Sequence, residues 1–595
     1  MSNEQLATAT IASMAVIATM KAKINHLSPY QHLGVIVTVH LLLSLPGLWV
    51  PYFNIDELTN ALYARFINAG MVGLKDFLGS TYLLTHYLYA LVYSFTEKNN
   101  MLPMHIVHTF WQAGTIGALY GAGSLLGNKK TGLWAAWFYC VFAHGFLSKD
   151  FYTPSAESLS LFPAVLCAIF VIRAFKNRAT LDYLLVGVFA AIAASFKAPM
   201  ACVLLAAVLA FLIGGGFCLR GFLALGFGFV CVIILPVCLV EPFGSGFGLM
   251  RDKFTETNTL YIQAYEGFSF LYWFIKFVIR TTLVLSASFA MTVFAVYGIR
   301  PVFRLGRFKS DDFRHTLFLF LWLVLLWFTI ALGKRVFYHY FVFLLGPLSL
   351  LAAEGVRFWD ERQPGAAKRV SRGKIWLLAT LGHVRKHMVL LMALPASLFF
   401  IEAACNFSTM PNDVTSSIEY VKQHTSGADR IYIWGNVPQL YFYSERLPST
   451  AYFWSDVLAG TSPGSPAMEY VRATNRNLNV QTMLMKDFQP HVFGPQENDF
   501  AADSNHLTGI SETELFTVAE ILERIDHPYW KKVFADFLTR PPTLFIDSSP
   551  ANIRGFGYFP IEKYELLKRF VEDNYRQETV VDGMIVYRLR SAGRL

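Results

Sequence analysis

Charged residues are scarce in this chain of 595 residues. Asp, Glu, Lys and Arg together make up 15% of the sequence, whereas 54% of it is hydrophobic. Soluble proteins of this length carry more charge, so the composition excludes an ordinary soluble protein and predicts a membrane protein. The 53 Phe, 28 Tyr and 12 Trp fit helices that face lipid and carry aromatic residues at the interfaces.

Cysteine is also rare, and its placement excludes a disulfide framework in the polar C-terminal region. All seven cysteines lie at or before Cys405, most of them within apolar runs. The region that follows therefore has no cysteine for a disulfide or a metal site. An early basic region and a cleavage site are missing from the mildly apolar stretch 6–20, so we expect an N-terminal helix there and no signal peptide.

A nucleic-acid partner is not expected, although the net charge is +9. The sequence lacks a long basic patch and a module that would stack bases. The basic residues gather instead in short loops between apolar runs, where they orient membrane spans. We therefore expect the chain to contact membrane lipids.

Long apolar runs are abundant. With roughly 17–25 apolar residues as the criterion, we expect a polytopic α-helical protein with about eleven transmembrane helices. They are expected near 33–50, 104–126, 131–148, 159–175, 182–196, 198–214, 219–240, 271–298, 316–333, 340–354 and 387–405. Counting the aromatic segment 82–95 as a further span would move the basic loops outside, so we predict a surface or re-entrant helix there.

The sequence changes character after the last span. Short apolar segments at 430–434, 542–547 and 584–587 alternate with amphipathic segments, which predicts a small α/β domain. We expect a transmembrane domain at 1–405, with a first outer loop at 51–103, and an α/β domain at 406–595. With the N-terminus in the cytoplasm, that domain and this loop face the periplasm or exterior of a cell inner (plasma) membrane.

Two adjacent carboxylates, Asp56 and Glu57, directly follow the first span. The apolar residues after them recur at helical spacing, which predicts a helix on the membrane surface. An acidic pair at this boundary suits a substrate whose reactive end is also there, such as a lipid phosphate. The alternative is that Asp56 only caps the helix.

Further polar residues are expected on the same face. Glu157 begins one span, Lys197 interrupts a run of about 30 mostly apolar residues, and Lys334, Arg335 and His339 join two spans through a short turn. Each has a structural alternative: a helix cap for Glu157, lipid contacts for the cations and aromatic packing for His339. As a set, cations placed against the positive-inside rule favour an anionic phosphate on this face.

These residues resemble the membrane glycosyltransferases of the GT-C superfamily, family 39 type, which includes protein O-mannosyltransferases and the aminoarabinose transferase of lipid A. The ordered set comprises the Asp56-Glu57 pair, FKAP at 196–199 and GKRVFYHYFVFLLGPL at 333–348. The last run is similar to a family segment in which basic residues and an HY-F pair precede an LLxPL helix. DRIYIWGN at 429–436 is similar to the outer domain of many bacterial members.

The resemblance implies a polyprenyl-phosphate sugar as donor. By position, Asp56 is the candidate general base, and Glu57 and Glu157 orient it or the acceptor. Lys197, Lys334, Arg335 and His339 are the candidate ligands of the lipid phosphate. Many members have Lys-Pro or His-Pro-Pro where this chain reads Thr85-His86-Tyr87, so His86 is a phosphate ligand by position only.

We therefore expect an inverting glycosyltransferase that needs no cofactor, although acidic pairs can bind a divalent cation. The acceptor is a glycan, a lipid such as lipid A, or a protein. Alternatives are a transporter or flippase for lipid-linked sugars, an O-antigen ligase-like enzyme with a diphosphate donor, and a membrane-anchored sensor or scaffold.

Overall fold

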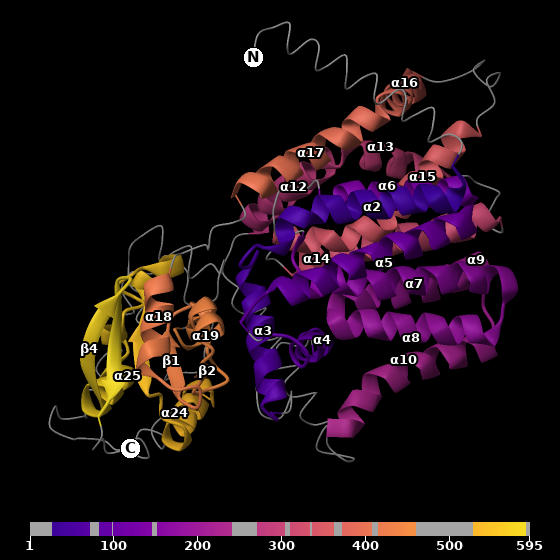
Figure 1. Ribbon diagram of the computed structural model, residues 1–595. Coiled ribbons are helices and arrows are strands. Elements are labelled where there is room, and N and C mark those ends of the chain that lie inside the picture. Colours follow the sequence, from indigo (N-terminus) through magenta and orange to yellow (C-terminus); the bar gives the residue numbers. More distant parts are fainter. Residues whose placement is uncertain are drawn as a thin grey trace, which may run out of the picture.

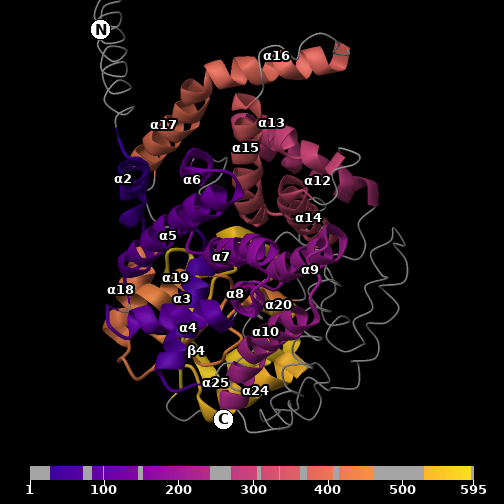
Figure 2. The same cartoon turned by 90° about the vertical axis from the view of Figure 1, so that its right-hand side faces the viewer.

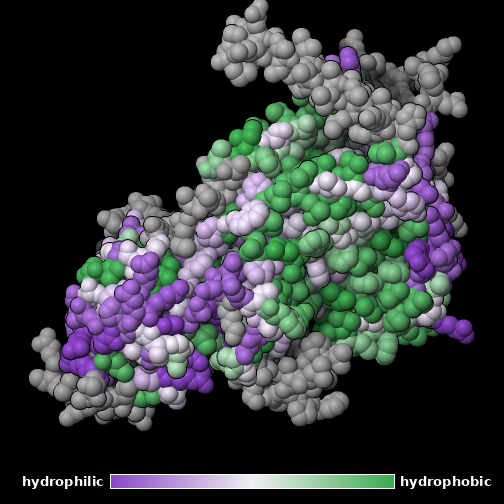
Figure 3. Space-filling view, viewed as in Figure 1, coloured by the Kyte–Doolittle hydropathy of each residue, from purple (hydrophilic) through white to green (hydrophobic). Residues whose placement is uncertain are grey.

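The structure, a computed structural model, describes residues 27–71, 83–97, 99–144, 152–240, 270–303, 310–333, 336–361, 372–406, 414–459 and 528–590. Figure 1 shows a body of helices that run side by side and, next to one end of it, a unit that contains the sheet. Hydrophobic residues cover the middle of the body, and hydrophilic residues cover the sheet unit and the opposite end (Figure 3).

The helices of the body follow the apolar runs of the sequence. They are α2 (Pro29–Leu48), α5 (Leu102–Leu126), α6 (Lys129–Phe142), α7 (Ala156–Asn177), α8 (Thr180–Phe196), α9 (Cys202–Gly214), α10 (Leu219–Val240), α12 (Phe270–Ala287), α13 (Phe289–Gly298), α14 (Asp311–Leu332), α15 (Leu345–Asp360), α16 (Arg372–Lys386) and α17 (Met388–Asn406). Four helical segments of the described part are long and apolar enough to cross a membrane, or five with one bent pair, and shorter apolar helices accompany them. The protein is thus a helical membrane protein, and the total of eleven spans stays a prediction.

The run expected as one span at 271–298 is divided into two helices. The axes on either side of Ser288 differ by 96°. The Ser288 hydroxyl donates to the Val284 carbonyl at 3.0 Å, and the Thr292 hydroxyl donates to the Leu285 carbonyl at 3.0 Å. Hydroxyls that bond nearby carbonyls offer the backbone an alternative to the helical ladder, which explains the break.

Glycine lets two helices of the body pack backbone to backbone. A Cβ atom at Gly298 of α13 would overlap the Leu351 carbonyl of α15, and one at Gly355 would overlap the Phe294 carbonyl. Small residues at such crossings are typical of membrane helices, whose association depends on close packing.

The two ends of the body carry different residues. The Asp56 end comprises the last turns of α2, α8 and α14 and the first turns of α5 and α7; the Arg357 end comprises the opposite ends of these helices. Figure 2 looks along the helices from the Arg357 end, with the sheet unit behind them. Two short helices lie at the Asp56 end, namely α3 (Ile55–Asn68) and α4 (Leu83–Tyr93). The second of these occupies the segment predicted to be a surface or re-entrant helix, and with 11 residues it is short for a span.

The sheet unit has five strands in the order β2-β1-β3-β5-β4. Strand β1 (Arg430–Trp434) pairs in parallel with β2 (Leu447–Pro448) and β3 (Leu544–Asp547), whereas β5 (Met584–Leu589) is antiparallel to β3 and β4 (Tyr575–Val581). The helices α18 (Thr415–His424), α19 (Pro438–Ser444), α20 (Ser455–Leu458), α24 (Pro528–Thr539) and α25 (Glu565–Asn574) accompany it. Strands β1, β3 and β5 lie in the short apolar segments of the sequence, whereas β2 and β4 were not predicted. The boundary at 405/406 and the outer location stay predictions.

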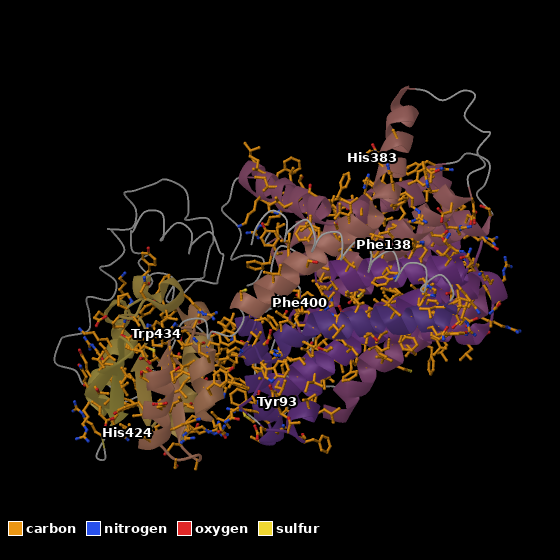
Figure 4. The ribbon with its side chains drawn as sticks, turned by 45° about the horizontal axis from the view of Figure 1, so that its top comes forward. Tyr93, Phe138, His383, Phe400, His424 and Trp434 are labelled. Carbon is orange, nitrogen blue, oxygen red and sulfur yellow. The ribbon has the colours of Figure 1, made fainter. Side chains whose placement is uncertain are left out.

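The sheet unit is joined to the Asp56 end through α19. Arg65 of α3 is buried, donates to the carbonyls of Tyr441 and Phe442 at 3.3 and 2.9 Å, and lies over the Phe442 ring. The Tyr443 hydroxyl donates to the Pro51 carbonyl at 2.6 Å. In Figure 4, Trp434 lies within the sheet unit and Tyr93 lies at the end of the body nearest to it. The unit is therefore fixed beside the acidic pair.

Candidate active site

The acidic pair lies at the first turn of α3, where its two members have opposite environments. The N-cap is Asn54, whose side chain accepts a hydrogen bond from the Asp56 amide at 3.2 Å. The alternative in which Asp56 caps this helix is therefore wrong. Asp56 is exposed, whereas Glu57 is 1% exposed, because neighbouring residues of a helix point in different directions.

Glu57 is held from two sides. One oxygen, Oε1, accepts from the Phe53 amide at 3.2 Å, and Oε2 lies 3.0 Å from Nε2 of His105 on α5. The Nδ1 atom of that ring lies 3.2 Å from the Leu48 carbonyl. Burial raises the pKa of the Glu57 carboxyl, and the hydrogen bond with His105 opposes this effect.

The turn between α2 and α3 is fixed by aromatic packing. The Phe53 ring lies 5.2 Å from that of His105 and 5.3 Å from that of Tyr152, between ring centroids. A Cβ atom at Gly47 would come within 2.6 Å of the Tyr152 ring and 3.0 Å of the Phe53 ring. Glycine at the end of α2 therefore makes room for the two rings that set the position of the acidic pair.

Tyr89 of α4 connects the acidic pair with the first turn of α7. Its hydroxyl donates to the Pro154 carbonyl at 2.9 Å, and the Asn60 side chain hydrogen-bonds to it. Both Asp56 and Glu57 interact with it electrostatically, and burial, the largest cause, raises its pKa well above the ordinary value. The neutral phenol thus lies between the acidic pair and α7.

Glu157 and Lys197 form an ion pair at the same end of the body. The Lys197 ammonium lies 2.6 Å from Glu157 Oε1, and the side chains are 13% and 5% exposed. Ser155 caps α7 by accepting from the Ser158 amide, so the cap alternative for Glu157 is wrong. The snorkelling alternative for Lys197 does not fit either, because its ammonium points to a buried carboxylate. A charge in this apolar run needs such a partner.

Aromatic residues of the 3-10 helix η4 (Tyr338–Leu344) adjoin this pair. The Lys197 ammonium lies 5.5 Å from the centroid of the Tyr340 ring, and the His339 ring lies 4.6 Å from that of Tyr340. His339 also interacts electrostatically with Glu157. The structure thus brings Glu157, Lys197 and His339 together, and Tyr89 connects this group with Asp56 and Glu57.

The other predicted phosphate ligands do not belong to this described group. His86 is 0% exposed and its ring lies 4.6 Å from that of Tyr63, between centroids. Burial lowers the pKa of His86 to about 3, so its imidazole is neutral and enclosed at ordinary pH. Lys334 and Arg335 lie outside the described residues.

Tyr89, His105 and Tyr340 are site residues that the sequence did not reveal. His105 carried a signal, since a polar residue near the start of the apolar run 104–126 needs a partner. Tyr340 belongs to the HY-F pair of the motif at 333–348, but only His339 of that pair was given a role. Tyr89 is one aromatic residue among many, and nothing in its spacing distinguishes it.

A pocket of about 360 Å³ opens at the start of the turn between α2 and α3. It is lined by the end of α2, at Trp49 and Val50, by the start of α5, at Met101 and Leu102, and by Tyr443 of the sheet unit. The pocket lies where the membrane body, the first loop and the sheet unit meet, and neither Asp56 nor Glu57 lines it.

Solved structures share this fold. The crystal structure of ArnT from Cupriavidus metallidurans bound to undecaprenyl phosphate covers 94% of this chain and 98% of its own, with a TM-score of 0.54 at 10% sequence identity. The structure of ArnT from the same organism in the apo state covers 93% of this chain and 97% of its own, with a TM-score of 0.53 at 11% sequence identity. An oligosaccharyltransferase from Archaeoglobus fulgidus has a lower TM-score, 0.48, at 10% identity, over 96% of this chain and 75% of its own. No protein-family model and no curated protein matches the chain.

The chain therefore has the fold of ArnT, in line with the fold that the resemblance of its motifs implied. At 10 and 11% identity, the likeness to ArnT defines the fold alone. The activity has to be argued from the site.

Proposed function

We propose that the protein is an inverting glycosyltransferase that moves a sugar from a polyprenyl-phosphate donor to an acceptor of the cell envelope. The observation that carries the proposal is the grouping at one end of the body. An exposed carboxylate, Asp56, and the Glu157–Lys197 ion pair lie at this end, and Tyr89 interacts electrostatically with Asp56 and donates to the Pro154 carbonyl just before α7. The undecaprenyl phosphate bound to the structurally similar ArnT supports the same class of donor.

The proposed location of the site is the outer face of the membrane. Four cations, Lys130, Lys176, Arg314 and Arg357, lie in the terminal turns of helices at the Arg357 end and contact neighbouring loops and helix ends. The positive-inside rule assigns such an end to the cytoplasm. The Asp56 end and the sheet unit then face the periplasm or exterior of the inner (plasma) membrane.

In the proposed reaction, the acceptor hydroxyl oxygen attacks the anomeric carbon of the donor. The bond from this carbon to the phosphate oxygen breaks, and polyprenyl phosphate leaves with the electron pair from the opposite face, which inverts the configuration. Asp56 takes the proton of the acceptor hydroxyl. Lys197, with His339 beside it, stabilises the charge on the departing phosphate, which has to compete with Glu157 for the ammonium. No step requires a metal ion.

The test is an assay of the purified chain in lipid with a polyprenyl-monophosphate sugar and an envelope acceptor. We expect free polyprenyl phosphate and glycosylated acceptor in equal amounts. Movement of the intact donor across the membrane without release would indicate the transporter or flippase. Release only from a diphosphate donor would indicate the O-antigen ligase-like enzyme. Mass spectrometry of envelope glycans from a deletion strain then distinguishes lipid A, polysaccharide and protein acceptors.

A further inference from the structure

The two neighbouring carboxylates at the start of α3 differ in a way that divides their roles. Asp56 is exposed, and Glu57 is 1% exposed with both oxygens engaged inside the protein. A carboxylate that cannot reach solvent or substrate cannot take a proton from an acceptor hydroxyl without a rearrangement. The role of Glu57 therefore depends on the groups that it bonds, the Phe53 amide and the His105 ring.

The hydrogen bonds of His105 determine where the protons of this pair lie. The Leu48 carbonyl can only accept, so Nδ1 of His105, 3.2 Å away, carries a hydrogen. The Nε2 atom, 3.0 Å from Glu57 Oε2, then has two possibilities. It accepts from a protonated Glu57, or it carries a second hydrogen as part of an imidazolium paired with a carboxylate. In both cases, one proton is shared and the pair has no net charge.

Burial favours the form without separated charges. The side chains of Glu57 and His105 are each 1% exposed, and removing two full charges from water costs more than removing two neutral groups. The chemistry of the site favours the same form. An anionic lipid phosphate has to bind near this loop, and a second negative charge beside Asp56 would repel it.

We propose that Glu57 is a positioning residue, which as a neutral acid bonded to neutral His105 ties α3 to α5, and that Asp56 alone provides the charge of the acidic pair. The inference rests on the proposed function. The tie extends from the Leu48 carbonyl of α2 through His105 to Glu57 and the Phe53 amide, so it closes the turn that precedes Asp56. Asp56 is the catalytic residue, and Glu57 acts through its position.

The decisive variant is Glu57→Gln. A glutamine amide reproduces the proposed form, because its oxygen accepts from the Phe53 amide and its NH₂ donates to Nε2 of neutral His105. We expect kcat and KM close to those of the wild type. Glu57→Ala removes both bonds, and we expect it to lower kcat by about 10²-fold through misplacement of Asp56, with a smaller change in KM. Glu419→Gln, on the exposed face of α18, is the matched control.

Activity in Glu57→Gln together with a loss in Glu57→Ala is not what a catalytic charge at Glu57 predicts. A loss in Glu57→Gln as large as that in Asp56→Asn would overturn the proposal, since it would show that the charge of Glu57 is required. Full activity of Glu57→Ala would also overturn it, since the tie would then position nothing.

Infrared spectroscopy tests the protonation state without using activity. In the difference spectrum between the wild type and Glu57→Gln at neutral pH, we expect the carbonyl stretch of a protonated carboxylic acid. Carboxylate bands alone would overturn the neutral pair, whatever the activity. If the wild type carries the acid band but transfers no sugar, the proposed function fails and the assignment of the proton stands.

Discussion

The two ends of the helical body both bury charge, but they do so differently. At the Arg357 end, the Arg357 guanidinium lies 2.6 Å from Glu354, 2.7 Å from Asp312 and 3.4 Å from Glu361. At the Asp56 end, the Lys197 ammonium lies 2.6 Å from Glu157 and 5.5 Å from the centroid of the Tyr340 ring. Three carboxylates lie around one cation at the first end, whereas a lysine meets a buried carboxylate and an aromatic ring at the second.

This difference separates a structural charge cluster from a site that is suited to bind a ligand. A guanidinium with three carboxylate partners from two helices fixes those helices and has little left to offer a ligand. A lysine can exchange a carboxylate for the phosphate of a substrate, because an ammonium is a compact charge on a flexible chain. Substitutions at each end should therefore have different effects on activity and stability.

Asp56→Asn should have the largest effect. It keeps the size of the side chain and removes the base, so we expect transfer to fall by about 10²–10⁴-fold while the protein still inserts and accumulates. Sugar transfer to the acceptor is the measurement. Asp311→Asn, at the exposed start of α14 on the Arg357 end, is the control and should keep full transfer. Normal transfer by Asp56→Asn would show that Asp56 is not the general base.

Lys197→Met should weaken both donor binding and stability. The substitution leaves Glu157 buried without its cation, which costs about 3–5 kcal/mol of unfolding free energy. The double variant Glu157→Gln/Lys197→Met removes the uncompensated charge, so we expect its thermal stability to recover. Transfer should stay low in the double variant, with a raised KM for the donor. Recovery of transfer together with stability would show that the pair is only structural.

Arg357→Met should reduce stability without affecting the chemistry. Glu354 is 3% exposed and would lose its closest cation, at a cost of about 3–5 kcal/mol. Thermal unfolding in detergent and turnover per folded molecule are the two measurements. We expect a lower melting temperature and an unchanged kcat. A selective loss of kcat would show that the two ends are coupled and that Arg357 does more than stabilise the helices.

Asp547→Asn should have the smallest effect, confined to the pH dependence of the sheet unit. Burial raises the pKa of Asp547 from 3.8 to about 6. Because the folded-state pKa is the higher one, its contribution to stability is present below about pH 4 and is lost as the pH rises through 6, by at most about 3 kcal/mol. The variant should lose this decline, as followed by tryptophan fluorescence during thermal unfolding of the full chain.

Asp429 of the same unit provides a control of opposite sign. Hydrogen bonds from Ser426 lower the pKa of Asp429, and the bond from the Ser426 backbone amide has the largest effect. The contribution of Asp429 to stability is therefore present at higher pH and is lost as the pH falls through its lowered pKa. Asp429→Asn should thus weaken the unit mainly above the acidic range. The same pH response in both variants would contradict the assignment of these carboxyls.

The sequence predicted the parts of this fold that depend on local pattern. Apolar runs located α5, α7 and α10, the short apolar segments located β1 and β3, and the cost of an unpaired charge indicated that Lys197 needs a partner. The turn at Ser288 was not predicted, because the residues around it are mostly apolar and hydropathy does not register a hydroxyl that bonds the backbone.

The contacts of the site depend on segments that are distant in the sequence. Glu57 and His105 are 48 residues apart, and Arg65 contacts residues more than 370 positions later. Pattern identified Asp56, Glu57, Glu157 and Lys197 as unusual, but packing alone determines that one acid is exposed and the other is buried. The roles within the acidic pair therefore had to come from the structure.

The most direct test of the account is to determine the structure of the full chain with undecaprenyl phosphate in a lipid environment. The account predicts the phosphate at the Asp56 end, within hydrogen-bonding distance of Lys197 and beside Tyr340, with Glu157 displaced from the ammonium. A phosphate bound among the cations of the Arg357 end, with the Glu157–Lys197 pair intact, would contradict it.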